Sequence, residues 1–79
     1  MSFHKRRLEK DIILKIYEDG GLSSLENYVT KADSLIATDK LGYHVLDTIL
    51  DLELTLPQKW DKIYQLIIKE KNGRKRTTI

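Results

Sequence analysis

The chain contains two histidines, and histidine is the side chain that most often supplies a general acid, a general base or a metal ligand near neutral pH. His4 is followed by three cationic residues at positions 5–7, whose charges disfavour both a bound divalent cation and a general base held near pH 7. His44 has Asp47 three residues further on, but no second histidine is close in the sequence. We therefore interpret His44 as an imidazole on a helix surface and predict no metal site.

Acid–base catalysis by paired carboxylates is the other chemistry that these residue types allow. Glu18 with Asp19 and Asp51 with Glu53 are close in the sequence, but charged residues near helix ends are usually solvated. The chain lacks a glycine-rich phosphate-binding loop, the dinucleotide-binding glycine pattern and a GxSxG nucleophile elbow. We therefore predict that the protein is not an enzyme and uses no cofactor.

Charge is distributed unevenly along the chain, whose formal net charge is +2. Residues 1–10 carry a net charge of +3 and residues 69–79 a net charge of +4, whereas residues 11–68 hold ten carboxylates and five lysines, a net charge of −5. This pattern describes an acidic body with two basic ends, which bears on the choice of partner and not on the fold.

The basic ends support one alternative function, a nucleic-acid-associated protein that binds phosphates without reading bases. The residues that would make these contacts are cations near the two ends: Lys5, Arg6, Arg7, Arg74, Lys75 and Arg76. A helix-turn-helix is disfavoured, because its second helix over residues 39–53 carries four carboxylates against Lys40 and no Arg, Asn or Gln to read bases. The simpler interpretation is that the basic ends are solvated.

A second alternative depends on the acidic middle of the chain. Residues 18–53 hold eight carboxylates and two lysines, a net charge of −6. Such a segment could occupy a basic groove as a mimic of nucleic acid.

The size of the chain allows one domain at most, and a chain of 79 residues buries roughly 60% of its unfolded surface. Because there is no cysteine, packing or self-association has to stabilise the fold. Apolar residues recur at steps of three and four, which indicates helices. We therefore predict an all-α fold, a compact bundle of four short helices over residues 3–18, 24–37, 39–53 and 57–71. Residues 1–73 would form a single helical domain, followed by a basic tail over residues 74–79.

Local signals set these boundaries. Ser23 with Glu26 and Thr55 with Gln58 have the spacing of capping boxes, and either residue of the pair 38–39 can cap the third helix. Between residues 50 and 56, leucines alternate with polar residues, a period of two that belongs to a strand. Because only the short segment 77–79 could pair with such a strand, we extend the third helix to about residue 53 and leave helix or strand open for residues 50–56.

The first and fourth segments carry more apolar residues than one helix face can hold. Five apolar residues lie within residues 12–17 and six within residues 60–68. Either the first helix is central and buries all of them, or part of this surface is exposed for a partner. The candidate protein-interface residues lie off the main stripes or carry large amphipathic rings: Leu14, Tyr17, Trp60 and Leu66. The partner would be another protein or a second copy of the chain, making an oligomer.

Neither a membrane nor export is indicated by the sequence. Runs of uninterrupted apolar residues reach three residues, and no apolar stretch with a cleavage pattern follows the opening basic residues. The absence of cysteine fits a reducing compartment. We therefore predict a cytoplasmic protein that does not contact membranes.

The size, the lack of catalytic motifs and the charge distribution are similar to those of small regulatory proteins encoded by phages and plasmids. That resemblance is one of composition and implies no particular partner. We therefore predict a small non-catalytic binding or regulatory protein that acts through protein–protein contacts.

Overall fold

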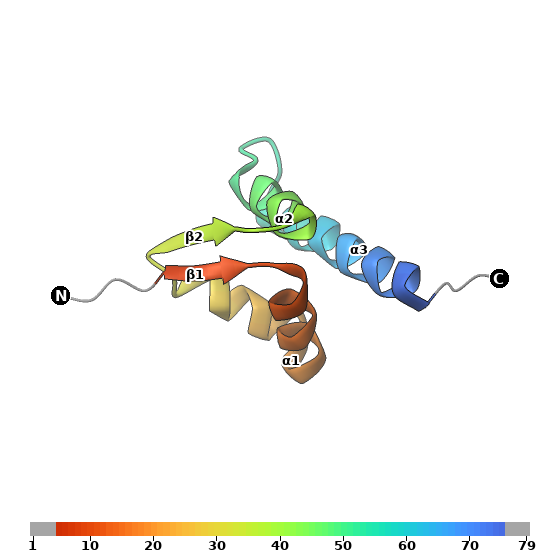
Figure 1. Cartoon of the computed structure of the whole chain (residues 1–79). Coiled ribbons are helices and arrows are strands. Elements are labelled where there is room, and N and C mark those ends of the chain that lie inside the picture. The colour runs from red at the N-terminus through yellow and green to blue at the C-terminus, as the bar shows by residue number, and fades with distance from the viewer. Residues whose placement is uncertain (1–4, 76–79) are drawn as a thin grey trace.

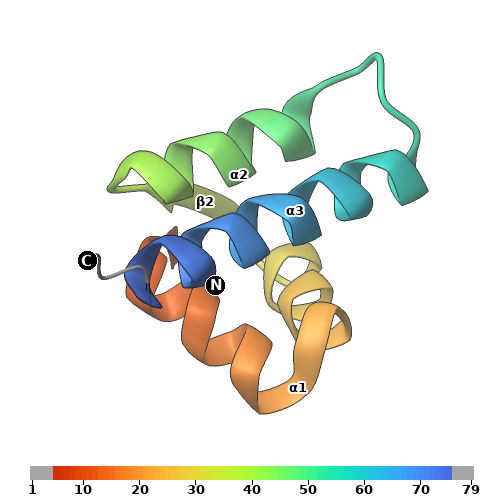
Figure 2. The ribbon, with the colours of Figure 1, turned by 90° about the vertical axis from the view of Figure 1, so that its right-hand side faces the viewer.

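The computed structural model describes the backbone of residues 5–75 and the side chains of residues 5–73, and this part of the chain has a mixed α/β fold (Figure 1). The elements follow in the order β1 (Lys5–Leu8), α1 (Lys10–Thr30), β2 (Ser34–Ala37), α2 (Lys40–Leu50) and α3 (Leu56–Lys75). Helices α2 and α3 run side by side, and α3 lies between α2 and α1 in the view of Figure 2. No helix in this part of the chain is long and apolar enough to cross a bilayer.

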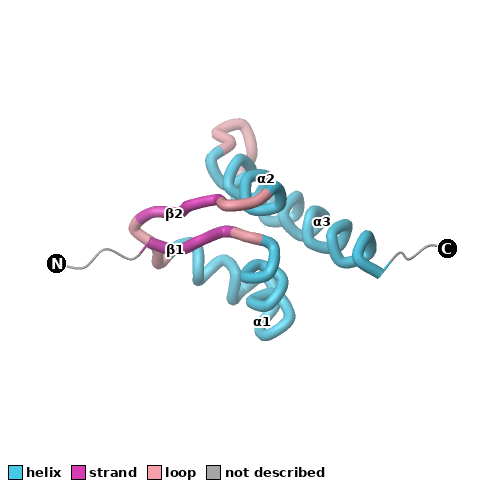
Figure 3. Tube along the Cα trace, in the orientation of Figure 1, coloured by secondary structure: helices cyan, strands magenta, loops and turns pink. Residues whose placement is uncertain are grey.

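The two strands form a parallel sheet, and α1 is the crossover between them (Figure 3). The register pairs Lys5 with Ser34 at one end and Leu8 with Ala37 at the other. Just past the sheet, the backbone N–H of Thr38 donates to the carbonyl of Leu8 at 3.2 Å. The predicted four-helix all-α bundle is therefore wrong, because the described residues form three helices and a two-stranded parallel sheet.

Two of the predicted helices included residues that are strands. The helix predicted over residues 3–18 contains β1, and the helix predicted over residues 24–37 contains β2. The backbone groups of these segments pair with a partner almost thirty residues away, and this pairing outweighs the local helical periodicity. The other two helices occur as α2 and α3, and residues 51–55 form the connection between them instead of extending α2.

Helix α1 bends at Gly21, whose φ of 74° lies in the left-handed region that favours glycine (Figure 2). The predicted break between residues 18 and 24 is present as this bend inside α1, and Ser23 and Glu26 lie in the helical segment that follows it. Because of the bend, both halves of α1 bury apolar side chains. These side chains are Ile13, Leu14, Leu25 and Val29.

The hydrophobic core draws side chains from the sheet and from all three helices. Leu8 of β1 is fully buried, and so are Val45 of α2 and Ile63 and Ile67 of α3. Arg6 and Leu8 point to the same face of β1, and their partners across the sheet, Leu35 and Ala37, point to that face of β2. The sheet therefore has one core face and one open face.

The Asp39 side chain joins the starts of two helices. One carboxylate oxygen accepts a hydrogen bond from the backbone N–H of Lys10 at 2.8 Å, and the other accepts one from the N–H of Gly42 at 2.9 Å. Glu9, at the N-cap of α1, makes no capping hydrogen bond with its own side chain, so Asp39 supplies that cap from a distant part of the chain.

Replacing Asp39 with alanine should lower the free energy of unfolding by about 2–3 kcal/mol, because two helix caps are lost together. Asn at this position has only one acceptor oxygen and should give an intermediate value. The matched control is Asp61→Ala, at an exposed position on α3, which should change stability by less than about 0.5 kcal/mol. Urea denaturation measures all three variants. Equal losses for Asp39→Ala and Asp61→Ala would contradict the shared cap.

Gly42 allows α2 to approach β1 closely, because a Cβ at this position would collide with the Leu8 carbonyl oxygen. At Gly73 of α3, a Cβ would meet nothing within 4 Å. Gly42→Ala should therefore destabilise the fold by about 1–3 kcal/mol although alanine favours helix, whereas Gly73→Ala should stabilise it by up to about 1 kcal/mol. Thermal melts of the two variants should shift in opposite directions; shifts of the same sign would show that the α2–β1 approach is not tight.

Candidate functional site

The histidines do not form a catalytic or metal-binding group in the described residues. His4 lies outside them. His44 is exposed on α2, and its backbone carbonyl accepts a hydrogen bond from the hydroxyl of Thr48 at 2.8 Å. No group of three or more His, Cys, Asp or Glu residues within the described part of the chain is arranged to hold a metal ion. His44 instead lines a groove.

The carboxylate pairs considered from the sequence have structural contacts. Glu18 forms an ion pair with Lys71 of α3 at 3.7 Å, and Asp19 pairs with a lysine one turn earlier in α1 at 3.9 Å. Asp51 accepts a hydrogen bond from the backbone N–H of Glu53 at 2.9 Å, which shapes the turn after α2. Three of these four carboxylates, those of Glu18, Asp19 and Asp51, therefore already have an ion pair or a hydrogen bond within the protein.

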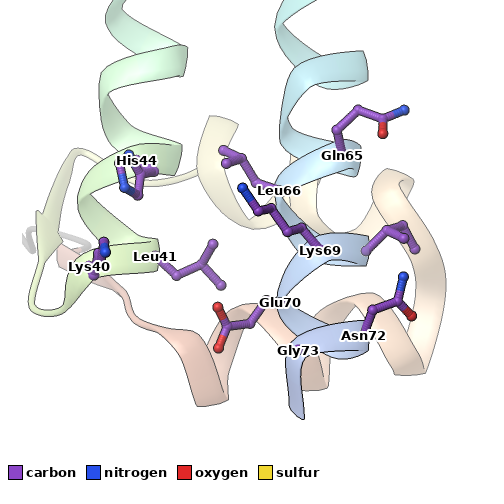
Figure 4. Close-up of a pocket in the computed structure, with 10 residues that line it drawn as sticks. Lys40, Leu41, His44, Gln65, Leu66, Lys69, Glu70, Asn72 and Gly73 are labelled. Carbon is purple, nitrogen blue, oxygen red and sulfur yellow. The ribbon is translucent and has the colours of Figure 1, made fainter. Parts of the chain in front are cut away.

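A groove lies between the first turns of α2 and the last turns of α3 (Figure 4). Leu41 of α2 and Leu66 of α3 provide its apolar surface, with Ile68 further along α3. Leu41 is 7% exposed and Leu66 is half-buried, so both are anchored in the core while they line the groove. The floor of the groove is therefore preformed by packed side chains.

A second hollow continues the groove towards the other end of α2. Both hollows are lined by His44 and Leu66, so they meet at these residues. Asp47 and Asp51 line the second hollow on the α2 side and Lys62 on the α3 side. The α2–α3 groove, as we call the two hollows together, thus follows most of the length of α2.

The two ends of the α2–α3 groove differ in charge. Lys40 and Lys69 line the first hollow, are exposed, and have no ion pair among residues with described side chains. Glu70, the carboxylate that lines the same hollow, forms an ion pair with Lys10 at 3.8 Å. The first hollow therefore has an excess of positive charge, whereas the second hollow is lined by two carboxylates and one lysine.

The connection between α2 and α3 exposes further apolar surface. Leu50, Leu52 and Leu56 are 63%, 95% and 60% exposed, and they lie at the end of the helix pair opposite to Lys40 and Lys69. The connection itself is held in place, because the Lys59 ammonium donates to the Ile49 carbonyl at 2.7 Å. Exposed leucines on a fixed connection are typical of a contact surface.

Four residues were predicted at a protein interface, and the structure separates them. Leu14 is 4% exposed in the core, so the prediction that it lies at the surface is wrong. The Tyr17 ring is half-buried, 6.2 Å from the Tyr64 ring, and Trp60 is half-buried against the core. Leu66 lines the α2–α3 groove and stays a predicted interface residue.

The basic residues predicted to bind phosphates do not come together. Lys5, Arg6 and Arg7 lie on β1, far from the C-terminal end of α3 in Figure 1, where Arg74 and Lys75 form the last turn; Arg76 lies outside the described residues. Arg6 stacks over the Tyr28 ring at 4.9 Å, and Arg7 pairs with Glu9 at 3.4 Å. Two of the three β1 cations therefore already have partners within the protein.

Comparison with known proteins gives no assignment: no family model, no curated protein and no solved structure matches the chain. The candidate site therefore depends on geometry alone. Sequence reasoning missed Lys40 and Lys69 as members of a site. Their spacing in the sequence could have indicated that they share a surface with other groove residues, because Lys40 is one helical turn from His44 and Lys69 is one turn from Leu66.

Two leucine substitutions distinguish core from surface. Leu14→Glu places a charge in the core and should cost several kcal/mol, enough to unfold a protein of this size. Leu52→Glu, at a position 95% exposed, should change stability by less than about 0.5 kcal/mol. Circular dichroism melts give both values. An unchanged melting temperature for Leu14→Glu would show that α1 does not pack as described.

Proposed function

We propose that the protein is a non-catalytic binding or regulatory protein, and that its α2–α3 groove binds an amphipathic segment of a protein partner. The observation that carries the proposal is the pairing of a preformed apolar floor with two cations, Lys40 and Lys69, that have no ion pair among the described side chains. A groove between two helices accepts the apolar face of a third helix, and anchors at three- and four-residue spacing then fill it.

The charges of the groove indicate the chemistry of that segment. Lys40 and Lys69 would pair with acidic residues at one end of the partner's apolar stripe, and Asp47 and Asp51 would favour basic residues towards the other end. The exposed leucines at 50–56 would extend the apolar contact beyond the groove. Opposite charges at the two ends would set the direction in which the segment binds.

The two alternatives have less support. Phosphate binding by the basic ends is weakened because Arg6 and Arg7 are engaged with Tyr28 and Glu9, and because β1 lies apart from the last turn of α3 (Figure 1). Mimicry of nucleic acid needs exposed, unpaired carboxylates. Several of the carboxylates in residues 18–53 already form ion pairs or hydrogen bonds within the protein, namely those of Glu18, Asp19, Asp39 and Asp51.

The double variant Lys40→Glu/Lys69→Glu should lose partner binding, because both cationic contacts become repulsive. We expect the affinity of the partner recovered by the wild-type protein from its own cytosol to fall by about tenfold or more. Recovery is measured after nuclease treatment and at two salt concentrations, followed by titration of the recovered partner against each variant. Higher salt should weaken the wild-type complex and reduce the difference between variants.

The matched control is Lys5→Glu/Lys31→Glu, which changes net charge equally at two exposed positions outside the groove. This control should retain the partner. If it loses binding as strongly as the groove variant, the groove is not the site. If recovery instead depends on nucleic acid and disappears with the Lys5 substitution, the phosphate-binding alternative replaces this proposal.

A further inference from the structure

The two-stranded sheet has two outer edges, and the sequence treats them differently. β1 carries Lys5, Arg6 and Arg7 at successive positions, and charged side chains on an edge oppose pairing with another strand. β2 has the sequence Ser-Leu-Ile-Ala, which contains neither charge nor proline. Of the two strands, only β2 therefore has an edge without charged residues or proline that would oppose pairing with another strand.

Backbone groups show the same asymmetry. The backbone N–H of Thr38 points towards β1, where it donates to the Leu8 carbonyl. Because the backbone groups of successive strand residues point to alternate sides, the N–H and C=O groups of Leu35 and Ala37 point away from β1. No hydrogen bond occupies these outward groups within the described residues. On β1, by contrast, the Arg7 carbonyl, which points away from β2, accepts a hydrogen bond from the Tyr28 hydroxyl at 3.0 Å.

The surroundings of β2 leave its edge accessible. No third strand pairs with the sheet in the described part of the chain, and in Figures 1 and 3 no strand lies alongside β2 on the side away from β1, where α2 is seen only near the C-terminal end of β2. Ile36, at the centre of the edge, is 42% exposed and points to the open face of the sheet, together with Lys5, Arg7 and Ser34. An accessible, uncharged edge with a central exposed isoleucine has the properties of a pairing strand.

We propose that β2 pairs antiparallel with β2 of a second copy of this chain, so that two sheets join into one of four strands. With the two-fold axis at Ile36, Leu35 of each copy lies opposite Ala37 of the other. These are the residues with outward backbone groups, and each such pair exchanges two hydrogen bonds, which makes four across the seam. This register satisfies every outward backbone group of the four-residue strand.

A second copy fits this edge because the strand is complementary to itself. The two Ile36 side chains meet across the axis as a directly opposed apolar pair on the open face, and Leu35 packs beside Ala37 on the core face. Just outside the strand, the register brings Asp33 near Asp39 of the other copy. The Asp39 carboxylate is directed inward to Lys10 and Gly42, which reduces repulsion at the seam.

A cysteine at position 36 tests the register directly, because the chain has no cysteine of its own. In a directly opposed pair that lacks backbone hydrogen bonds, the two side chains are close enough for a disulfide. Ile36→Cys should therefore form a disulfide-linked dimer under a mild oxidant, at least about tenfold faster than the control Leu50→Cys, since pairing raises the effective concentration of the two thiols. Leu50 is more exposed than Ile36, so random collision would favour the control.

Sedimentation of the unmodified chain and of Ile36→Lys provides the second measurement. The unmodified chain should form dimers in a concentration-dependent manner, and Ile36→Lys should be monomeric with an unchanged circular dichroism spectrum, because two lysines would oppose each other at the axis. Leu50→Lys should remain dimeric. Equal crosslinking of both cysteine variants, or a wild-type chain that stays monomeric at every concentration, would overturn the proposal. Neither result depends on the α2–α3 groove, which Ile36 does not line.

Discussion

The hydrogen bonds of Asp39 are the interactions on which the arrangement of the other elements depends. One carboxylate caps α1 through Lys10 and α2 through Gly42, and its charge lies at the positive ends of both helix dipoles. The neighbouring Thr38 adds a backbone bond to Leu8 and a hydroxyl bond to the Glu9 carboxylate at 2.9 Å. These bonds hold the end of each strand against the start of a helix, so the sheet and α2 are positioned together.

The parts of the fold that could be predicted from the sequence are those that depend on contacts between residues close together in the chain, such as helix caps. Asp39 caps α2 as its position indicated, and Thr55 with Gln58 forms a reciprocal capping box at 2.9 and 3.3 Å. The strands could not be predicted, because each has four residues, and Leu35 and Ile36 continue the helical spacing of the segment before them. Each strand is stabilised by pairing with the other, which lies nearly thirty residues away, and no pattern within either segment indicates this pairing.

The candidate site was predictable only in part, for a related reason. The first and fourth segments do carry an excess of apolar residues, but in a fold with a strand layer and a bent α1 Leu14 is buried, whereas Leu66 lines the groove between α2 and α3. The cations of the groove, Lys40 and Lys69, are far apart in the sequence. They become neighbours because α2 and α3 run side by side, which follows from the short connection at residues 51–55.

The groove and the β2 edge are separate surfaces, and their relation has a consequence for binding. Because α2 starts three residues after β2 ends, a dimer joined through β2 would carry two α2–α3 grooves in a fixed relation. A partner with two suitable segments would then bind both grooves, and the second contact would form at a high effective concentration. Pairing of the chains would therefore raise the affinity for such a partner without any new contact in either groove.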